Sequence, residues 1–184
     1  ASFDSANLTK ADLSLADLSD ADFGKATLTG ATLTNAILTG ADFSDTSLTN
    51  GILKSVDMTN AIFKKARLTG ADLEEADLTA ADLSTADLVN AKLTQVNSTG
   101  TNFTSATMIR ADLEGAIMIG AILTNTNLSA ANLSGADLTG ANLMGADLTK
   151  AQFVDTNLTG VIMTTASIIG AVWEGTTCPD GTSS

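Results

Sequence analysis

The sequence predicts an all-β fold in which the chain winds into a four-sided coil that repeats every 20 residues. Two regularities of residues 1–175 carry this prediction. The chain divides there into 35 blocks of five residues in one unbroken register, and the third residue of every block is apolar except at Ser98. The first residue of the block is Ala in 27 of these 35 blocks and small in the others.

A period of five residues excludes a long helix and a regular strand, because these need apolar residues at spacings near 3.6 and 2. Within one block the first and third residues point to one side and the second to the other, as in a short extended segment. The fourth and fifth residues are rich in Ser, Thr, Asn, Asp and Gly, which favour turns. Each block is therefore predicted as one extended side followed by a corner, and four corners close a coil.

Aromatic residues support the 20-residue period independently. Phenylalanines recur at this spacing in the third position, and we predict that they form one interior column: Phe3, Phe23, Phe43, Phe63 and Phe103. Near the other end, Leu133, Phe153 and Trp173 share a different column. Such recurrence is expected if coils stack on each other, because no coil of 20 residues buries its own apolar side chains alone.

Ser98 is the defect in this repeat, since it places a hydroxyl where the other blocks have an apolar side chain. A buried hydroxyl needs a backbone acceptor or costs about 1–3 kcal/mol. Two interpretations remain open, a local defect or bend of the coil and a functional hinge.

The two ends of the chain depart from the repeat in different ways. The segment 176–184 contains Pro179-Asp180-Gly181, a turn sequence, and we expect it to fold over the last coil as a cap above Trp173. The chain begins inside the repeat without a Met. We therefore expect a processed product whose first coil has an uncapped edge.

Composition excludes several classes of function. The net charge of −12 disfavours nucleic acid and anionic membranes as direct partners, and no apolar run reaches the ~18 residues of a membrane span. The chain has no His, and its single cysteine, Cys178, has no candidate base beside it. Asp and Asn in the second position follow from the repeat itself, so we predict no metal site, no cofactor and no catalytic residues.

Isoleucines in outward positions are the candidate contact patch. Ile117, Ile119 and Ile122 are predicted to point outward around one corner, with Ile109 nearby. An exposed apolar group of this kind marks a protein contact, whereas the strand propensity of Ile is the competing explanation.

The repeated phrase A-(D/N)-L-X-X, as in Ala131-Asn132-Leu133-Ser134-Gly135, resembles the pentapeptide-repeat protein family over residues 1–175. The resemblance implies a right-handed quadrilateral β-helix of about nine coils, with the first and third residues of each block inside, followed by the tail 176–184. The ending Cys178-Pro179-Asp180-Gly181 is similar to that of cyanobacterial members, many of them exported, which favours the periplasm, the thylakoid lumen or the extracellular space over the cytoplasm.

Three functions are compatible with these observations. The first is a non-catalytic structural scaffold, a rigid acidic rod that docks an unidentified protein by a face or an end. The second, which the family resemblance implies, is a DNA mimic that modulates a type II topoisomerase, although the chain has neither the inserted loops nor the C-terminal helix of such members. The third is a structural protein that associates end to end through its uncapped N-terminal coil.

Overall fold

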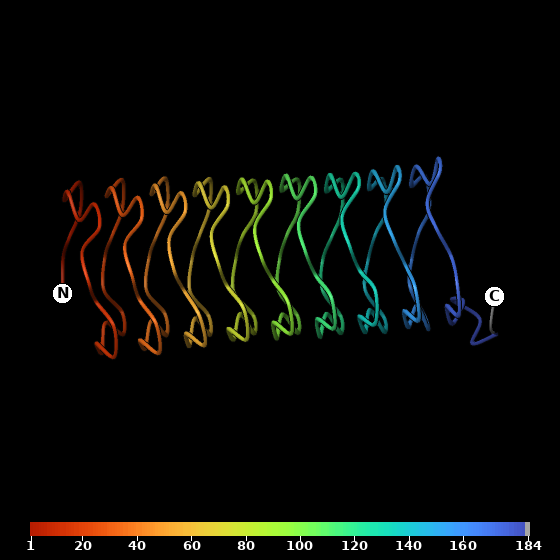
Figure 1. The fold of residues 1–184 in the computed structure, drawn as a ribbon, viewed down its shortest axis with the longest axis horizontal. Helices are drawn as coiled ribbons and strands as arrows, with labels where there is room; N and C mark the ends of the chain where they lie inside the picture. Colours follow the sequence, from red (N-terminus) through yellow and green to blue (C-terminus); the bar gives the residue numbers. More distant parts are fainter. Residues whose placement is uncertain (183–184) are drawn as a thin grey trace.

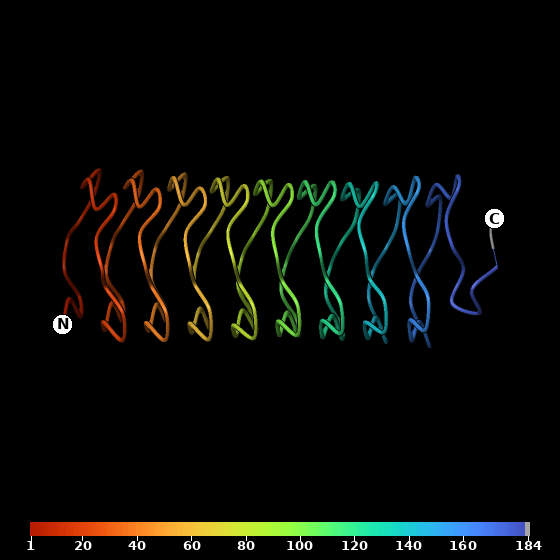
Figure 2. The same cartoon turned by 90° about the horizontal axis from the view of Figure 1, so that it is seen from below.

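Parallel pairing between residues 20 apart organises the whole chain. In the computed structural model, which describes residues 1–182, the second residue of each block forms an isolated parallel bridge with the residue 20 positions later, from Ser2–Asp22 to Asn157–Thr177. Figures 1 and 2 show the result, a rod of stacked coils with the two termini at opposite ends. Residues 1–182 contain bridges and turns and no helix.

The backbone hydrogen bonds explain why the period is five residues. The amide of Phe23 donates to the carbonyl of Asp42 in the next coil at 2.7 Å, whereas the amide of Ala26 turns back to the carbonyl of Phe23 at 2.9 Å and closes the corner. The fifth residue of every block has positive φ, from Ser5 to Gly175. A turn with positive φ at its third residue favours Gly, Asn and Asp, the residues that the sequence often supplies there.

The core is a narrow stack of small and branched side chains. Third-position residues from Phe23 to Phe153 are fully buried, together with the small first-position residues that flank them. Four phenylalanine rings stack at centroid distances of 4.7, 4.5 and 4.8 Å, from Phe3 through Phe23 and Phe43 to Phe63. These distances match the ~4.8 Å separation of paired strands, because each coil adds one ring to the column.

Threonines in the first position are buried, and their hydroxyl groups are hydrogen-bonded. Thr126 donates its hydroxyl to the carbonyl of Phe103, 23 residues earlier, at 2.7 Å, and Thr46 bonds to Phe23 in the same way at 2.8 Å. Among the described residues no buried side-chain nitrogen or oxygen lacks a hydrogen-bond partner. The corner therefore accepts Thr in place of Ala because the carbonyl beneath it can accept a second hydrogen bond.

The C-terminal segment starts as a further side of the coil. Thr177 pairs with Asn157, and the carbonyl of Pro179 accepts from the amide of Gly160 at 2.8 Å. Pro179 fits because it occupies the fourth position, whose amide takes no part in the ladder between coils. The predicted cap also includes residues 183–184, which lie outside the described residues.

Candidate interaction surface

Outward polar side chains mostly bind each other, and the turn explains why. The second-position Asn157 accepts from the amide of Thr159 at 3.1 Å and from its hydroxyl at 2.7 Å. The Asn157 amide group also donates to Asp137 Oδ1 at 3.1 Å and to Thr139 Oγ1 at 2.9 Å in the coil before. Most of the Asp, Asn and Thr repeat therefore serves the coil rather than a ligand.

Hydrogen bonds of this kind lower the pKa of two second-position carboxylates, those of Asp57 and Asp147. The hydroxyl of Thr59, then its amide, and the hydroxyl of Thr39 hold the pKa of Asp57 below its usual 3.8. Asp147 has a lowered pKa for the same reason, with Thr149 and Ser129 as donors. Hydrogen bonds to the ionised form favour it, so these carboxylates stay charged on the surface at neutral pH.

Three of the four predicted contact residues lie together. Ile117, Ile119 and Ile122 follow one another around a corner of the same coil, with 43%, 40% and 41% of their surface exposed. Ile109 does not join them, because its carbonyl accepts from Asn90 in the ladder on the opposite side of the coil. Its side chain is also half-buried. The candidate patch therefore contains Ile117, Ile119 and Ile122, which we call the isoleucine corner.

Two exposed residues near this corner were missed by the sequence analysis as members of the patch. Ile162 lies two coils above Ile122 in the same ladder, and Met144 lies one coil above it, two residues beyond Asn142. The sequence does mark Met144 as an unusual residue, because it occupies the fourth position, where Ser and Thr predominate.

Ser98 lies directly beneath the isoleucine corner. It is fully buried, and its hydroxyl donates to the carbonyl of Ile117 at 3.2 Å. The amide of Ser98 donates to the same carbonyl at 2.7 Å, so the ladder continues through this position. Phe103, the other predicted interior residue in this region, is fully buried in the phenylalanine column, where Leu83 separates it from Phe63.

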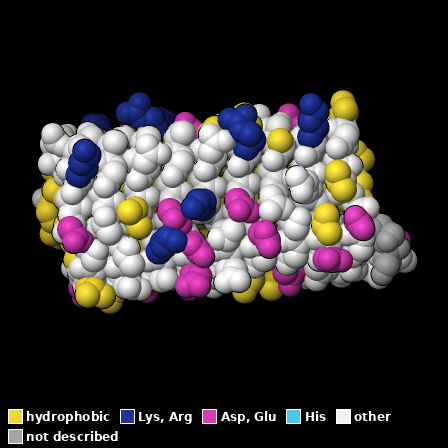
Figure 3. All heavy atoms as spheres, viewed as in Figure 1, with side chains coloured by type: hydrophobic (Ala, Val, Ile, Leu, Met, Phe, Trp, Pro, Cys, Tyr) yellow, Lys and Arg dark blue, Asp and Glu magenta, His cyan; other side chains and the backbone are white. Residues whose placement is uncertain are grey.

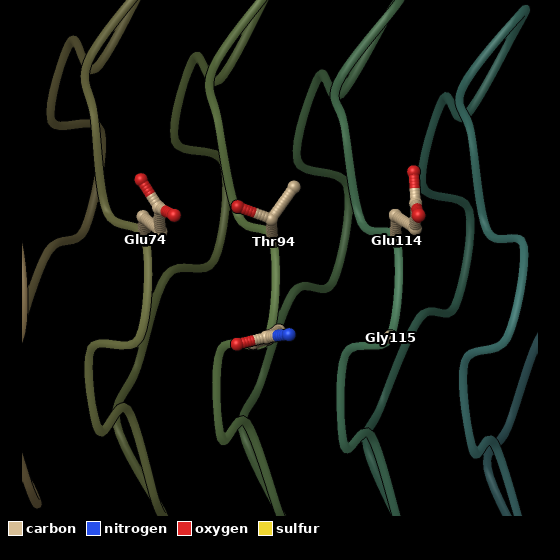
Figure 4. Close-up of a pocket in the computed structure, with 5 residues that line it drawn as sticks. Glu74, Thr94, Glu114 and Gly115 are labelled. Carbon is tan, nitrogen blue, oxygen red and sulfur yellow. The ribbon is translucent and has the colours of Figure 1, made fainter.

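A shallow hollow of about 280 Å³ opens at the corner of the coil that precedes the isoleucine corner, lined by Glu74, Thr94, Gln95, Glu114 and Gly115. Figure 4 shows Glu74, Thr94 and Glu114 in line on successive coils. Lys54 neutralises one of the two carboxylates, since its Nζ lies 2.6 Å from Glu74 Oε2 and 3.3 Å from Asp72 Oδ2. Within residues 1–182 no three Cys, Asp or Glu side chains are grouped closely enough to hold a metal ion.

Charges of both signs mix on the face that Figure 3 shows, where Lys and Arg lie along the upper rim and also among the Asp and Glu in the middle of the face. At the C-terminal end of the rod, the third-position residue Ile168 is 50% exposed, and Trp173 stacks on Phe153 at 4.4 Å. Cys178 is a half-buried free thiol. The part of the chain that the structure describes includes no helix that could span a membrane.

A family model described as pentapeptide repeats matches the chain in eight copies, over residues 1–35, 26–64, 61–97, 86–125 and 126–164. A comparison with curated proteins finds no match. Among solved structures, the chain is similar to HetL, a pentapeptide repeat protein involved in heterocyst differentiation regulation in the cyanobacterium Nostoc sp. strain PCC 7120. The two share 34% sequence identity over 97% of this chain and 87% of HetL, with a TM-score of 0.51.

Two further structures are similar over smaller parts or at lower identity. A pentapeptide repeat protein of the Arabidopsis thaliana thylakoid lumen is 34% identical over 51% of this chain and 62% of its own, with a TM-score of 0.37. QnrB1, a plasmid-mediated fluoroquinolone resistance protein, is 15% identical over 88% of this chain and 86% of its own, with a TM-score of 0.41.

Proposed function

Because the chain belongs to the pentapeptide repeat family, we propose that it is a non-catalytic interaction scaffold, a rigid acidic rod that docks a partner protein by its side. We infer a right-handed coil of about nine turns over residues 1–175, with the segment 176–184 closing its end. Function in such repeat proteins resides in the residues grafted on the ladder rather than in the ladder itself.

The isoleucine corner is the observation that carries this proposal. Three neighbouring Ile side chains are held outward by the ladder, and each keeps about two fifths of its surface in water. Most other solvated positions of the coil are polar, and many of their Asp, Asn, Ser and Thr side chains hydrogen-bond to each other. An apolar group in such a setting is typical of protein contact sites.

Affinity capture from an extract of the source organism tests the scaffold. The wild-type rod is compared with a variant that carries Ile117→Lys, Ile119→Lys and Ile122→Lys, after both are shown to unfold at the same temperature. A partner that the wild type retains and the triple variant loses supports the proposal. If every captured protein stays bound to the variant, the isoleucine corner is not the docking site.

The alternative function is a DNA mimic that modulates a type II topoisomerase, which the net charge of −12 favours. A supercoiling assay with purified gyrase and increasing amounts of the rod tests it. Inhibition of supercoiling or protection of the enzyme at micromolar concentration would support mimicry, and an unchanged reaction would remove this alternative.

End-to-end self-association is the third possibility. It is favoured by the third-position residues of the first coil, since Phe3, Leu8, Leu13 and Leu18 are only partly buried. Light scattering over a range of protein concentrations tests it, because a mass that stays monomeric at every concentration contradicts association.

A further inference from the structure

One side of the rod is built from segments that contain no Lys or Arg. It is formed by eight-residue segments that repeat at a spacing of 20, from 15–22 through 115–122 to 175–182, and the bridges stack these segments on each other. They contain 11 of the 21 carboxylates and none of the nine Lys and Arg residues. We call this surface the acidic side. The rest of the chain holds the other ten carboxylates and all nine cations, so it is nearly neutral.

The centre of the acidic side is uncharged. The stacked segments 95–102 and 115–122 contain no Asp, Glu, Lys or Arg. The second of them presents the isoleucine corner. Gly100 and Gly120 form the turn at this corner and have no side chains. The space around them is open, since nothing lies within 4 Å of where a Cβ would be at either position. The exposed Ile side chains therefore lie next to backbone that no side chain covers.

Carboxylates lie on both sides of this centre. Asp77 pairs with Asn97 in the ladder on one side, and Asp137 pairs with Ile117 on the other. Two exposed acids in the corner column extend the same rim: Glu75, one coil before Gln95, and Asp155, two coils after Gly115. An apolar centre depleted of charge within a polar rim is the arrangement of specific protein interfaces.

The rim keeps most of its charge available. The ion pairs between described residues join Lys54 and Lys92 to acids outside the acidic side. Only Lys64 reaches a carboxylate of this side, that of Asp82 at 3.2 Å. Asp77, Glu75 and Asp137 accept hydrogen bonds from the uncharged hydroxyls of Thr79, Ser55 and Thr139, which leaves their charge to attract a partner.

We propose that the acidic side is the docking surface of the rod and that its occupant is a protein with Lys and Arg side chains around an apolar centre. This inference rests on the proposed scaffold function and adds the chemistry of the partner. Complementary charge across an interface speeds association and rejects like-charged partners. A second copy of this chain does not offer that complement, because its remaining surface has no net positive charge.

Two synthetic peptides probe this surface directly: (Lys-Ile)4, which offers cations and apolar side chains, and (Lys-Ser)4, which offers the cations alone. Binding is measured by fluorescence anisotropy, and the contact site is mapped by amide chemical shifts of the labelled rod. We expect (Lys-Ile)4 to bind about tenfold more tightly, a difference of about 1.4 kcal/mol. The largest shift changes are expected in residues 115–122.

Matched variants separate the apolar centre from the rim. Ile117→Ser with Ile119→Ser and Ile122→Ser should reduce (Lys-Ile)4 binding to the level of (Lys-Ser)4. The control Ile52→Ser with Ile169→Ser and Val172→Ser removes three exposed apolar residues elsewhere and should change it less than about twofold. For the rim, Glu75→Lys should weaken both peptides, whereas Asp45→Lys, at an equivalent corner outside the acidic side, should not.

Equal binding of the two peptides, or equal effects of the test and control variants, would overturn the assignment. If Glu75→Lys weakens both peptides and the Ile→Ser changes have no effect, the surface recognises charge only, as a DNA mimic would. That result would also contradict a role of the apolar centre in binding. The scaffold function can survive such a result. If a natural partner still binds the Ile→Ser variant but no longer binds the control variant, the scaffold function stands. The assignment of the acidic side as the docking surface is then wrong.

Discussion

Gly70 and Gly100 offer a matched test of how neighbouring coils restrict the corner. Both are fifth-position glycines with φ of +65°. A Cβ added at Gly70 would lie 2.5 Å from Oδ1 of Asn50 in the preceding coil, whereas a Cβ at Gly100 would meet nothing within 4 Å. Replacement of each by Ala therefore imposes the same backbone cost and differs only in the contact with Asn50.

The expected magnitudes follow from these two contributions. Left-handed backbone costs an L-residue about 1–2 kcal/mol, partly offset by about 0.4–1 kcal/mol because Ala loses less chain entropy on folding. We expect Gly100→Ala to lower the free energy of unfolding by about 1 kcal/mol. Gly70→Ala should cost about 1 kcal/mol more, the strain of moving the Asn50 amide away from its rotamer.

Urea unfolding followed by circular dichroism measures both variants, and a double-mutant cycle isolates the contact. In an Asn50→Ala background, Gly70→Ala should cost no more than Gly100→Ala, because the clashing amide is absent. An equal cost of the two glycine replacements in the wild-type background would refute the reasoning. So would an excess at Gly70 that persists without Asn50.

Three further predictions test the interior and the surface. Phe43→Ala should cost about 3–5 kcal/mol and Phe43→Leu less than about 1.5 kcal/mol by urea unfolding, because Leu already occupies this column at Leu83. Thr126→Val should cost about 1 kcal/mol by the same measurement, since it removes one buried hydrogen bond. The lowered pKa of Asp57 contributes stability that is fully present above the unfolded-state value near 3.8 and is lost as pH falls through the lower folded value. The melting temperature of the wild type should therefore fall more steeply below about pH 4 than that of Asp57→Asn, and parallel curves would contradict this.

The isoleucine corner shows both what the repeat predicts and where that prediction ends. Its outward direction follows from position within the block, so the sequence alone predicts that Ile117, Ile119 and Ile122 face solvent, as the structure shows. Their role as a contact patch stays a prediction. Ile109 was grouped with them wrongly, because eight residues along the chain correspond to almost two sides of the coil. Met144 was not predicted as part of the patch, although it is an apolar residue in the outward fourth position.

The C-terminal segment shows a feature that the sequence did not predict. Its composition departs from the repeat, and Pro179-Asp180-Gly181 predicted a turn that folds over the last coil. The backbone continues past Gly175 because the fourth-position amide, the group that Pro lacks, is not used between coils. Pro is tolerated at this position because of the hydrogen bonds that the corner makes. Turn and strand preferences of single residues do not predict this.

The sequence by itself determined the period of five residues, the inward first and third positions and the 20-residue column of phenylalanines, because local turns set the register and each coil must bury the next. The tertiary structure decided which hydroxyl bonds to which carbonyl 23 residues earlier and how much of each outward Ile side chain stays exposed. It also stacks the segments that contain no Lys or Arg on each other, so that they form the continuous acidic side. These features depend on contacts between coils, which no single block contains.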